Sequence, residues 1–163
     1  MKLTYREMRP DDLPAVLAVR LSTVENAITL EELESEYGIT PQSLAAAMAS
    51  HVKGWLCEDA GRAVGFAMGD RANGEVQVVA VLPEYEGRGV GKRLLLYVQD
   101  WLFSAGYAEI WLLANPDPTI RAHGFYRKLG WRATGRMQGD DEVMTLPIPA
   151  RLSPQSVKKR TSS

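Results

Sequence analysis

Residues 86–92, Glu-Gly-Arg-Gly-Val-Gly-Lys, have the composition of a loop that binds phosphate. They follow an apolar run typical of a strand, residues 75–81, and precede a run typical of a helix, residues 92–102. Glycines let the backbone approach an anion closely, and the N–H groups of the first helical turn point at it along a favourable dipole. The spacing therefore predicts a site for a phosphate-bearing ligand between this strand and this helix.

Two familiar phosphate-binding motifs do not fit this spacing. A P-loop requires Ser or Thr directly after Gly-Lys, because that hydroxyl holds Mg²⁺, and Arg93 stands there instead. A dinucleotide fingerprint requires G-x-G-x-x-G, and neither Gly87 nor Gly89 starts such a run. A nucleotide hydrolase of the P-loop type is therefore disfavoured.

Two blocks of sequence resemble the GNAT superfamily of acyl-CoA N-acyltransferases. The first, residues 81–91, is similar to a family strand end, V-x-P-x-Y, followed by the pyrophosphate loop Gln/Arg-x-x-Gly-x-Gly/Ala. The second, residues 121–131, is similar to the family's helix and turn, R-A-x-x-F-Y-x-x-x-G-F/W. The blocks stand in the family's order, and Glu86 is the one departure in the loop, where Gln or Arg is usual.

The resemblance implies acetyl-CoA as the cosubstrate, held mainly by backbone groups. The loop residues implied for the pyrophosphate are Glu86, Gly87, Arg88, Gly89, Val90, Gly91 and Lys92, with the N–H groups of residues 88–92 as donors. On the preceding strand, the resemblance implies that the N–H of Val79 meets the thioester oxygen and that Val81 pairs with the pantetheine amides. By pattern alone, both valines are equally ordinary core residues of a strand.

Amide formation from a thioester needs an acid for the leaving thiolate and a base for the amine. The resemblance implies Tyr126 as the acid, and a tyrosine's reference pKa of about 10 keeps it protonated at neutral pH. Glu75 matches the place where some members have a catalytic glutamate, and it should share one side of the strand with Gln77 and Val79 unless a bulge intervenes. The alternatives are a tyrosine packed in an interface with its hydroxyl bonded to water or backbone, and a solvated carboxylate beside the turn at residues 73–74.

Thr119 and the two histidines give less specific signals. Thr119 stands where the family often has an Asn that touches the cofactor, so it either makes that contact or caps the helix. His51 and His123 are expected to be structural or exposed. Cys57 lies in an apolar run and is expected to be a buried thiol. No Cys/His cluster has metal-site spacing, so no metal is expected.

Size and composition predict one globular domain, residues 1–147, followed by a disordered basic tail, residues 148–163. The tail has four basic and no acidic side chains, so the net charge of −1 leaves −5 on the domain. An acidic domain disfavours nucleic acid and favours an amine-bearing acceptor. The single cysteine, the lack of a signal peptide and the lack of a long apolar run predict a cytoplasmic location without membrane contact, and a homodimer is possible.

The elements that must position these groups follow from periodicity and turn signals. Strands are predicted at residues 3–8, 53–58, 63–70, 75–82, 109–114, 131–136 and 142–146, and helices at 12–22, 29–37, 41–49, 89–105 and 119–129, with Asp11 or Asp12, Thr29 and Pro41 at helix starts. This order predicts an α/β (α+β) fold: a central mixed, mostly antiparallel sheet of about six or seven strands with helices on both faces. A helix links the strands at 75–82 and 109–114, so these two should be parallel.

These features together predict an N-acetyltransferase that moves an acetyl group from acetyl-CoA to a primary amine by direct attack. The alternative is a CoA-binding sensor or regulatory module without turnover. The acceptor depends on residues 22–40 and 136–142. Their acidic side chains, which would suit an amine, are Glu25, Glu31, Glu32, Glu34, Glu36, Asp140, Asp141 and Glu142.

Overall fold

The computed structural model describes residues 2–22, 29–117 and 119–150, which form two compact units, Met1–Val98 and Gln99–Ser163. The boundary falls within helix α4 (Val90–Ser104), so its first turns belong to the first unit and its last turns to the second. The part of the expected tail from residue 151 onward, and Glu25 of the expected acceptor segment, lie outside the described residues.

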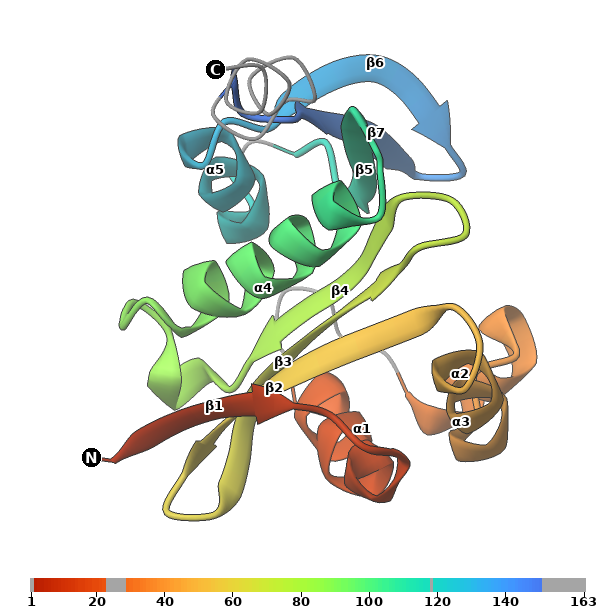
Figure 1. Cartoon of the computed structure of the whole chain (residues 1–163), viewed down its shortest axis with the longest axis vertical. Helices are drawn as coiled ribbons and strands as arrows, with labels where there is room; N and C mark the ends of the chain where they lie inside the picture. The colour runs from red at the N-terminus through yellow and green to blue at the C-terminus, as the bar shows by residue number, and fades with distance from the viewer. Residues whose placement is uncertain (1, 23–28, 118, 151–163) are drawn as a thin grey trace, which may run out of the picture. The chain divides into compact units, whose positions relative to one another are not determined.

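The strands of the first unit form an antiparallel meander, in which each strand pairs with the next along the chain (Figure 1). They are β1 (Leu3–Glu7), β2 (Val52–Asp59), β3 (Arg62–Asp70) and β4 (Glu75–Val81). Ala60 and Gly61 have φ angles of 50° and 84°. Two consecutive positive φ angles give the tight turn whose twist matches a hairpin, and the predicted turn between β2 and β3 is confirmed.

The helices between β1 and β2 follow local signals closely. They are α1 (Leu13–Leu21), preceded by a 3₁₀ turn (Pro10–Asp12), then α2 (Leu30–Tyr37) and α3 (Pro41–Met48). The hydroxyl of Thr29 accepts a hydrogen bond from the backbone N–H of Glu32 at 3.1 Å. Gly38 ends α2 with a φ of 64°. Both predicted ends of α2 are therefore confirmed.

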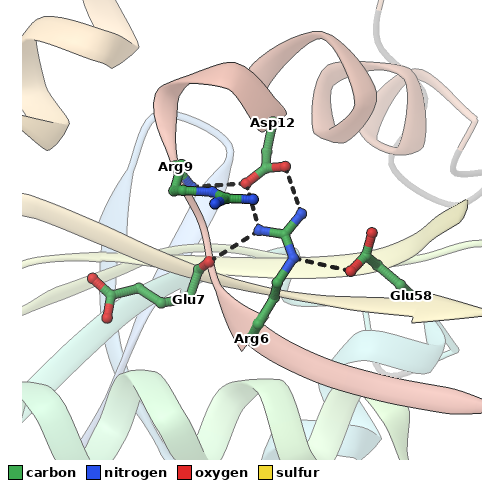
Figure 2. A network of polar contacts seen from close by, with 5 residues as sticks. All are labelled: Arg6, Glu7, Arg9, Asp12 and Glu58. Carbon is green, nitrogen blue, oxygen red and sulfur yellow. Dashed lines mark hydrogen bonds and ion pairs between the residues drawn. The ribbon is translucent and has the colours of Figure 1, made fainter. Parts of the chain in front are cut away.

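The guanidinium of Arg6 on β1 ties the start of α1 to the sheet (Figure 2). It donates to both carboxylate oxygens of Asp12 at 2.7 and 2.8 Å and to Glu58 on β2 at 2.9 Å. The hydrogen bond from Arg6 holds the pKa of Asp12 below its usual value. Asp12 directly precedes α1 but caps no N–H of that helix. The expected cap of α1 by Asp12 is therefore wrong, because its carboxylate instead binds Arg6 and accepts from the N–H of Arg9 across the 3₁₀ turn.

The first turns of α4 and the helix α1 cover opposite faces of the meander (Figure 2). A Cβ on Gly65 of β3 would lie 3.1 Å from Val90 and 3.2 Å from Leu94 of α4. Gly65 pairs with Cys57 of β2 and Val81 of β4, and partners across a sheet share a face. These residues therefore lie on the α4 face, while Arg6 and its partners lie on the α1 face.

Cys57 is fully buried on the α4 face of β2. Tyr5 of β1 pairs with it across the sheet, and the Tyr97 ring of α4 lies 6.3 Å from the Tyr5 ring. Burial raises the pKa of the Cys57 thiol. The predicted buried thiol is confirmed.

A β-bulge at Gln77 changes the faces along β4. The pairs across β3 and β4 are Ala67 with Val79, Met68 with Val78, Gly69 with Val76 and Asp70 with Glu75. Gln77 is the extra residue of β4 and has no partner on β3. The alternation of side chains between the two faces of the sheet is therefore reversed at residues 75–76 relative to residues 78–81. Glu75 therefore lies on the α1 face with Asp70, opposite to Val79, and the bulge overturns the expected common side.

The second unit contains the end of α4 followed by β5 (Glu109–Ala114), α5 (Arg121–Lys128), β6 (Arg132–Gln138) and β7 (Asp141–Pro147). β7 lies between β5 and β6 and is antiparallel to both (Figure 1). Ile110 and Leu112 of β5 and Trp131 after α5 are buried in this unit. The expected parallel pairing of strands 75–82 and 109–114 concerns the relation between the two units and stays a prediction.

Candidate functional site

The glycine-rich loop leads from β4 into α4 through a short 3₁₀ turn, Pro83–Tyr85. Gly87 and Gly89 have φ angles of 76° and 80°, a region that other residues rarely adopt. A Cβ on Gly89 would meet no atom within 4 Å, and residues 86–89 are exposed. The loop thus presents its backbone to open space.

The first turn of α4 presents backbone N–H groups to the same loop. The N–H of Arg93 donates to the carbonyl of Gly89 at 3.1 Å, which is the first hydrogen bond of the helical series. The N–H groups of Val90, Gly91 and Lys92 precede it and point out of the helix end. Such groups and the helix dipole favour a phosphate at this position. Contact of residues 86–92 with a pyrophosphate stays a prediction.

The arginines near the loop lie against aromatic rings. The Arg93 guanidinium lies 4.4 Å from the centre of the Tyr5 ring, and its hydrogen bond with Tyr97 raises the pKa of Arg93. The Arg88 guanidinium lies 5.5 Å from the centre of the Tyr85 ring, within the loop region itself. Arg93 is therefore engaged with β1 and α4, whereas Arg88 stays beside the predicted pyrophosphate position.

A hydrogen bond from Tyr85 fixes the entry of the loop to the β2–β3 hairpin. The Tyr85 hydroxyl donates to the carboxylate of Asp59, and this bond holds the pKa of Asp59 below its usual value. Sequence reasoning missed the Tyr85–Asp59 contact because 26 residues separate the partners and no local pattern links them.

Glu86 and Lys92, which flank the glycines of the loop, have exposed side chains.

The backbone N–H and C=O groups of Val79 and Val81 in β4 point away from β3. The N–H of Leu82 donates to the carbonyl of Val64 in β3 at 2.9 Å. The polar groups of successive strand residues point to opposite edges, so those of Val81 and Val79 point to the other edge of β4. This orientation is compatible with the predicted contacts of Val79 with a thioester oxygen and of Val81 with pantetheine.

Glu75 is half-buried at the start of β4. Its backbone N–H bonds the side-chain oxygen of Asn73 at 3.0 Å. Burial raises the pKa of the Glu75 carboxyl, the charge of Asp70 adds to this rise, and a hydrogen bond with Asn73 opposes it. A raised pKa brings a carboxylate closer to the range of an effective general base. Glu75 is therefore not a fully solvated turn carboxylate, and its role as the base stays a prediction.

Tyr126 on α5 lies against two aromatic side chains. Its ring centre is 5.2 Å from that of Phe125 and 6.0 Å from that of Trp131, both in edge-on geometry. The Trp131 indole N–H donates to the side-chain oxygen of Gln99 at 3.2 Å, a partner that sequence reasoning missed. Burial raises the pKa of Tyr126 to about 12. The hydroxyl therefore stays protonated at neutral pH, as a proton donor to a thiolate must.

Thr119 lies exposed before α5. Its hydroxyl and its N–H both donate to one carboxylate oxygen of Asp117, at 2.7 and 2.9 Å. The residue directly before the helix is Ile120, and no side chain caps α5 there. The predicted capping role of Thr119 is therefore wrong, because Asp117 binds its hydroxyl. A contact of Thr119 with the cofactor stays a prediction.

His51 and Asp70 form a polar pair that sequence reasoning missed. The Nδ1 atom of His51 lies 2.9 Å from one carboxylate oxygen of Asp70, and Asp70 is buried. Asp70 is the cross-strand partner of Glu75, so the pair borders the predicted base. The other histidine, His123, is buried in α5.

The described ranges, 2–22, 29–117 and 119–150, hold no group of three or more His, Cys, Asp or Glu side chains placed to bind a metal ion. In the same part of the chain, no helix is both long and apolar enough to cross a bilayer.

Comparison with known sequences gives a family and two relatives. Residues 21–131 match the model of the acetyltransferase (GNAT) family. Over 63 residues the chain is 40% identical to mycothiol acetyltransferase of Renibacterium salmoninarum, covering 39% of this chain and 18% of that protein. Over 71 residues it is 37% identical to glucosamine 6-phosphate N-acetyltransferase of Trypanosoma brucei brucei, covering 44% and 46%. The matches therefore span less than half the length of either relative.

The fold is shared with solved acetyltransferase structures. The PaiA N-acetyltransferase of Thermoplasma acidophilum, in complex with coenzyme A, superimposes with a TM-score of 0.74 at 20% identity, covering 90% of this chain and 99% of that one. A GNAT-family acetyltransferase of Staphylococcus aureus Mu50 gives 0.72 at 17% identity, covering 91% and 100%. These likenesses confirm the predicted fold class, a mixed, mostly antiparallel sheet with helices.

Proposed function

The chain belongs to the acetyltransferase (GNAT) family, and we propose that it moves an acetyl group from acetyl-CoA to a primary amine by direct attack. The amine nitrogen attacks the thioester carbon, so that a C–N bond forms and the C–S bond breaks. The amine loses one proton and the departing thiolate gains one. The charge that develops on the thioester oxygen and the two proton transfers each have a candidate group among the residues described above.

Binding of acetyl-CoA rests on the loop before α4, and this loop is the observation that supports the proposal best. The positive φ angles of Gly87 and Gly89 expose the backbone directly before the first N–H groups of the helix. The pyrophosphate would accept from the N–H groups of residues 88–92, and Arg88 would add a positive charge. Glu86 would keep its exposed carboxylate turned toward solvent.

The thioester would lie along the edge of β4 to which Val79 and Val81 direct their backbone groups. A hydrogen bond from the N–H of Val79 would stabilise the negative charge that develops on the thioester oxygen. Tyr126 would donate its proton to the leaving thiolate, since its raised pKa of about 12 keeps that proton in place until the thiolate forms. Thr119 would contact the cofactor beside α5.

Glu75 would accept the proton of the amine. It lies on the α1 face of the meander, opposite to the face on which α4 begins. An amine that approaches from the α1 face would meet Glu75 without crossing the sheet. Four residues of strand separate Glu75 from Val79, roughly 13 Å, so one or two water molecules would relay the proton.

The proposal is tested by acetyl transfer to a panel of primary amines: polyamines, amino acids, amino sugars, aminoglycosides and peptide N-termini. Released CoA is measured as free thiol, and the acetylated product by mass spectrometry. We expect stoichiometric thiol and product with at least one class, and formation of both about 100-fold more slowly in the Tyr126→Phe variant. Tight binding of acetyl-CoA without turnover of any acceptor would instead favour the alternative function, a CoA-binding sensor or regulatory module.

A further inference from the structure

Asp70 and Glu75 face each other at the end of the β3–β4 hairpin. They are cross-strand partners, and the bulge at Gln77 places both side chains on the α1 face. Directly opposed side chains on an antiparallel pair have Cβ atoms about 5 Å apart. Two carboxylates held so close disfavour simultaneous ionisation.

The carboxylate of Asp70 is anchored by His51 and by the backbone of Ala72. One oxygen lies 2.9 Å from Nδ1 of His51 and accepts from the N–H of Ala72 at 2.8 Å. Asp70 is only 8% exposed, whereas the His51 side chain is 41% exposed. These two contacts fix the position of the Asp70 carboxylate.

In the described part of the chain, two basic side chains near this pair in the sequence or in the sheet make contacts elsewhere. Arg71 directs its guanidinium to the backbone carbonyl of Ser50 at 3.0 Å. Lys53 of β2 pairs across the sheet with Gly69, on the opposite face, and lies 3.6 Å from the carboxylate of Glu7. Among the described residues, Asp70 is the charged group that acts on the Glu75 carboxyl, whose pKa is raised by burial and by that charge.

We propose that Asp70, anchored by His51, is a positioning residue for Glu75: its fixed charge favours the protonated form of Glu75 and thereby suits that carboxylate to accept the proton of the attacking amine. This role rests on the proposed function, in which Glu75 is the base.

The direct test is the titration of Glu75 by ¹³C NMR of protein labelled at the glutamate carboxyl carbons, with Glu75→Gln to assign the signal. Asp70→Asn keeps the shape of the side chain and an acceptor oxygen but removes the charge. The pH at the titration midpoint of Glu75 (the Glu75 midpoint) is therefore expected to fall. His51→Gln removes the imidazole but keeps the charge of Asp70, so the midpoint is not expected to fall. An unchanged midpoint in Asp70→Asn, or an equal fall in both variants, would overturn the proposal.

The pH profile of kcat/KM then connects this titration to turnover. Its acid limb reports the base of the free enzyme, so Asp70→Asn should move that limb to lower pH. The ratio of variant to wild-type kcat/KM should be at least about threefold higher at pH 5.5 than at pH 8.5. In the Glu75→Gln background, Asp70→Asn should leave the limb in place.

The two measurements separate the two ways of failing. A lowered Glu75 midpoint without acetyl transfer to any amine would uphold the tuning and contradict the proposed function. In the other case, acetyl transfer occurs, but Asp70→Asn moves the acid limb of the pH profile equally in the wild-type and Glu75→Gln backgrounds. That result would uphold the proposed function and overturn the role of Asp70.

Discussion

The indole N–H of Trp131 donates a hydrogen bond of 3.2 Å to the side-chain oxygen of Gln99, and both side chains are buried. The same tryptophan packs edge-on against Tyr126, and its backbone N–H donates to the Tyr126 carbonyl at 3.1 Å. The end of α4 therefore helps to orient the tyrosine that would protonate the thiolate.

Gln99→Met should destabilise the protein and reduce turnover. Methionine fills similar volume but leaves the buried indole N–H without its acceptor, which costs about 1–3 kcal/mol. Urea denaturation measures the free energy of unfolding. Asp100→Asn, at the exposed neighbouring position, is the control and should change it by less than about 0.5 kcal/mol. Equal stability of Gln99→Met and wild type would show that this bond contributes nothing.

Tyr126→Phe should lower kcat by about 100-fold and leave the Kd for acetyl-CoA nearly unchanged, because it removes only the donated proton. A pKa raised to about 12 keeps the hydroxyl protonated below that pH, so Tyr126 should cause no alkaline decline of kcat up to about pH 10. Steady-state kinetics from pH 6 to 10 measure both effects. Wild-type turnover in the variant would assign the proton to water or to another group.

Gly89→Glu should abolish acetyl-CoA binding in a folded protein. The added carboxylate occupies the space beside the loop and repels the pyrophosphate. Gly61→Glu is a matched control, because Gly61 has a similar φ of 84° and equally open space, but lies in the β2–β3 hairpin. Both variants should lose about 1–2 kcal/mol of stability through backbone strain. Calorimetry should detect acetyl-CoA binding in Gly61→Glu alone, and equal affinities would contradict the cofactor site.

Asp12→Asn should destabilise the protein at pH 7 by about 1–2 kcal/mol, because it breaks the charged hydrogen bonds with Arg6. The pKa of Asp12 is lowered in the folded state, so its stabilisation is present above the unfolded value of about 3.9 and is lost as the pH falls below it. The difference between variant and wild type should therefore shrink from pH 6 to pH 3. A constant difference across that range would assign the effect to packing.

Local chemistry made part of this protein predictable. The cap at Thr29, the left-handed end at Gly38 and the turn at Gly61 depend on neighbouring residues alone, so they can be recognised without the rest of the fold. The glycine-rich loop before α4 was predictable for the same reason, because the spacing of its glycines and the helix that follows can be recognised from neighbouring residues alone.

Contacts between distant residues were the part that no pattern revealed. The bulge at Gln77 depends on how β4 aligns with β3, and it moves Glu75 to the other face. The Asp70–His51 pair joins residues 19 positions apart, and a glutamine in an apolar helix gives no sign that a tryptophan 32 residues later will bind it. Asp12 has a sequence position typical of a cap of α1, yet its carboxylate binds Arg6 on β1 and the backbone N–H of Arg9.

The burial of Cys57 has a practical use. It is the sole cysteine of the chain and has no solvent exposure, and its raised pKa keeps it a thiol rather than the nucleophilic thiolate. A chromogenic disulfide reagent added to the folded protein should therefore react with liberated coenzyme A and leave the polypeptide unlabelled. The same reagent used without substrates measures how often the α4 face of β2 becomes exposed, because each modified chain records one exposure of its buried thiol.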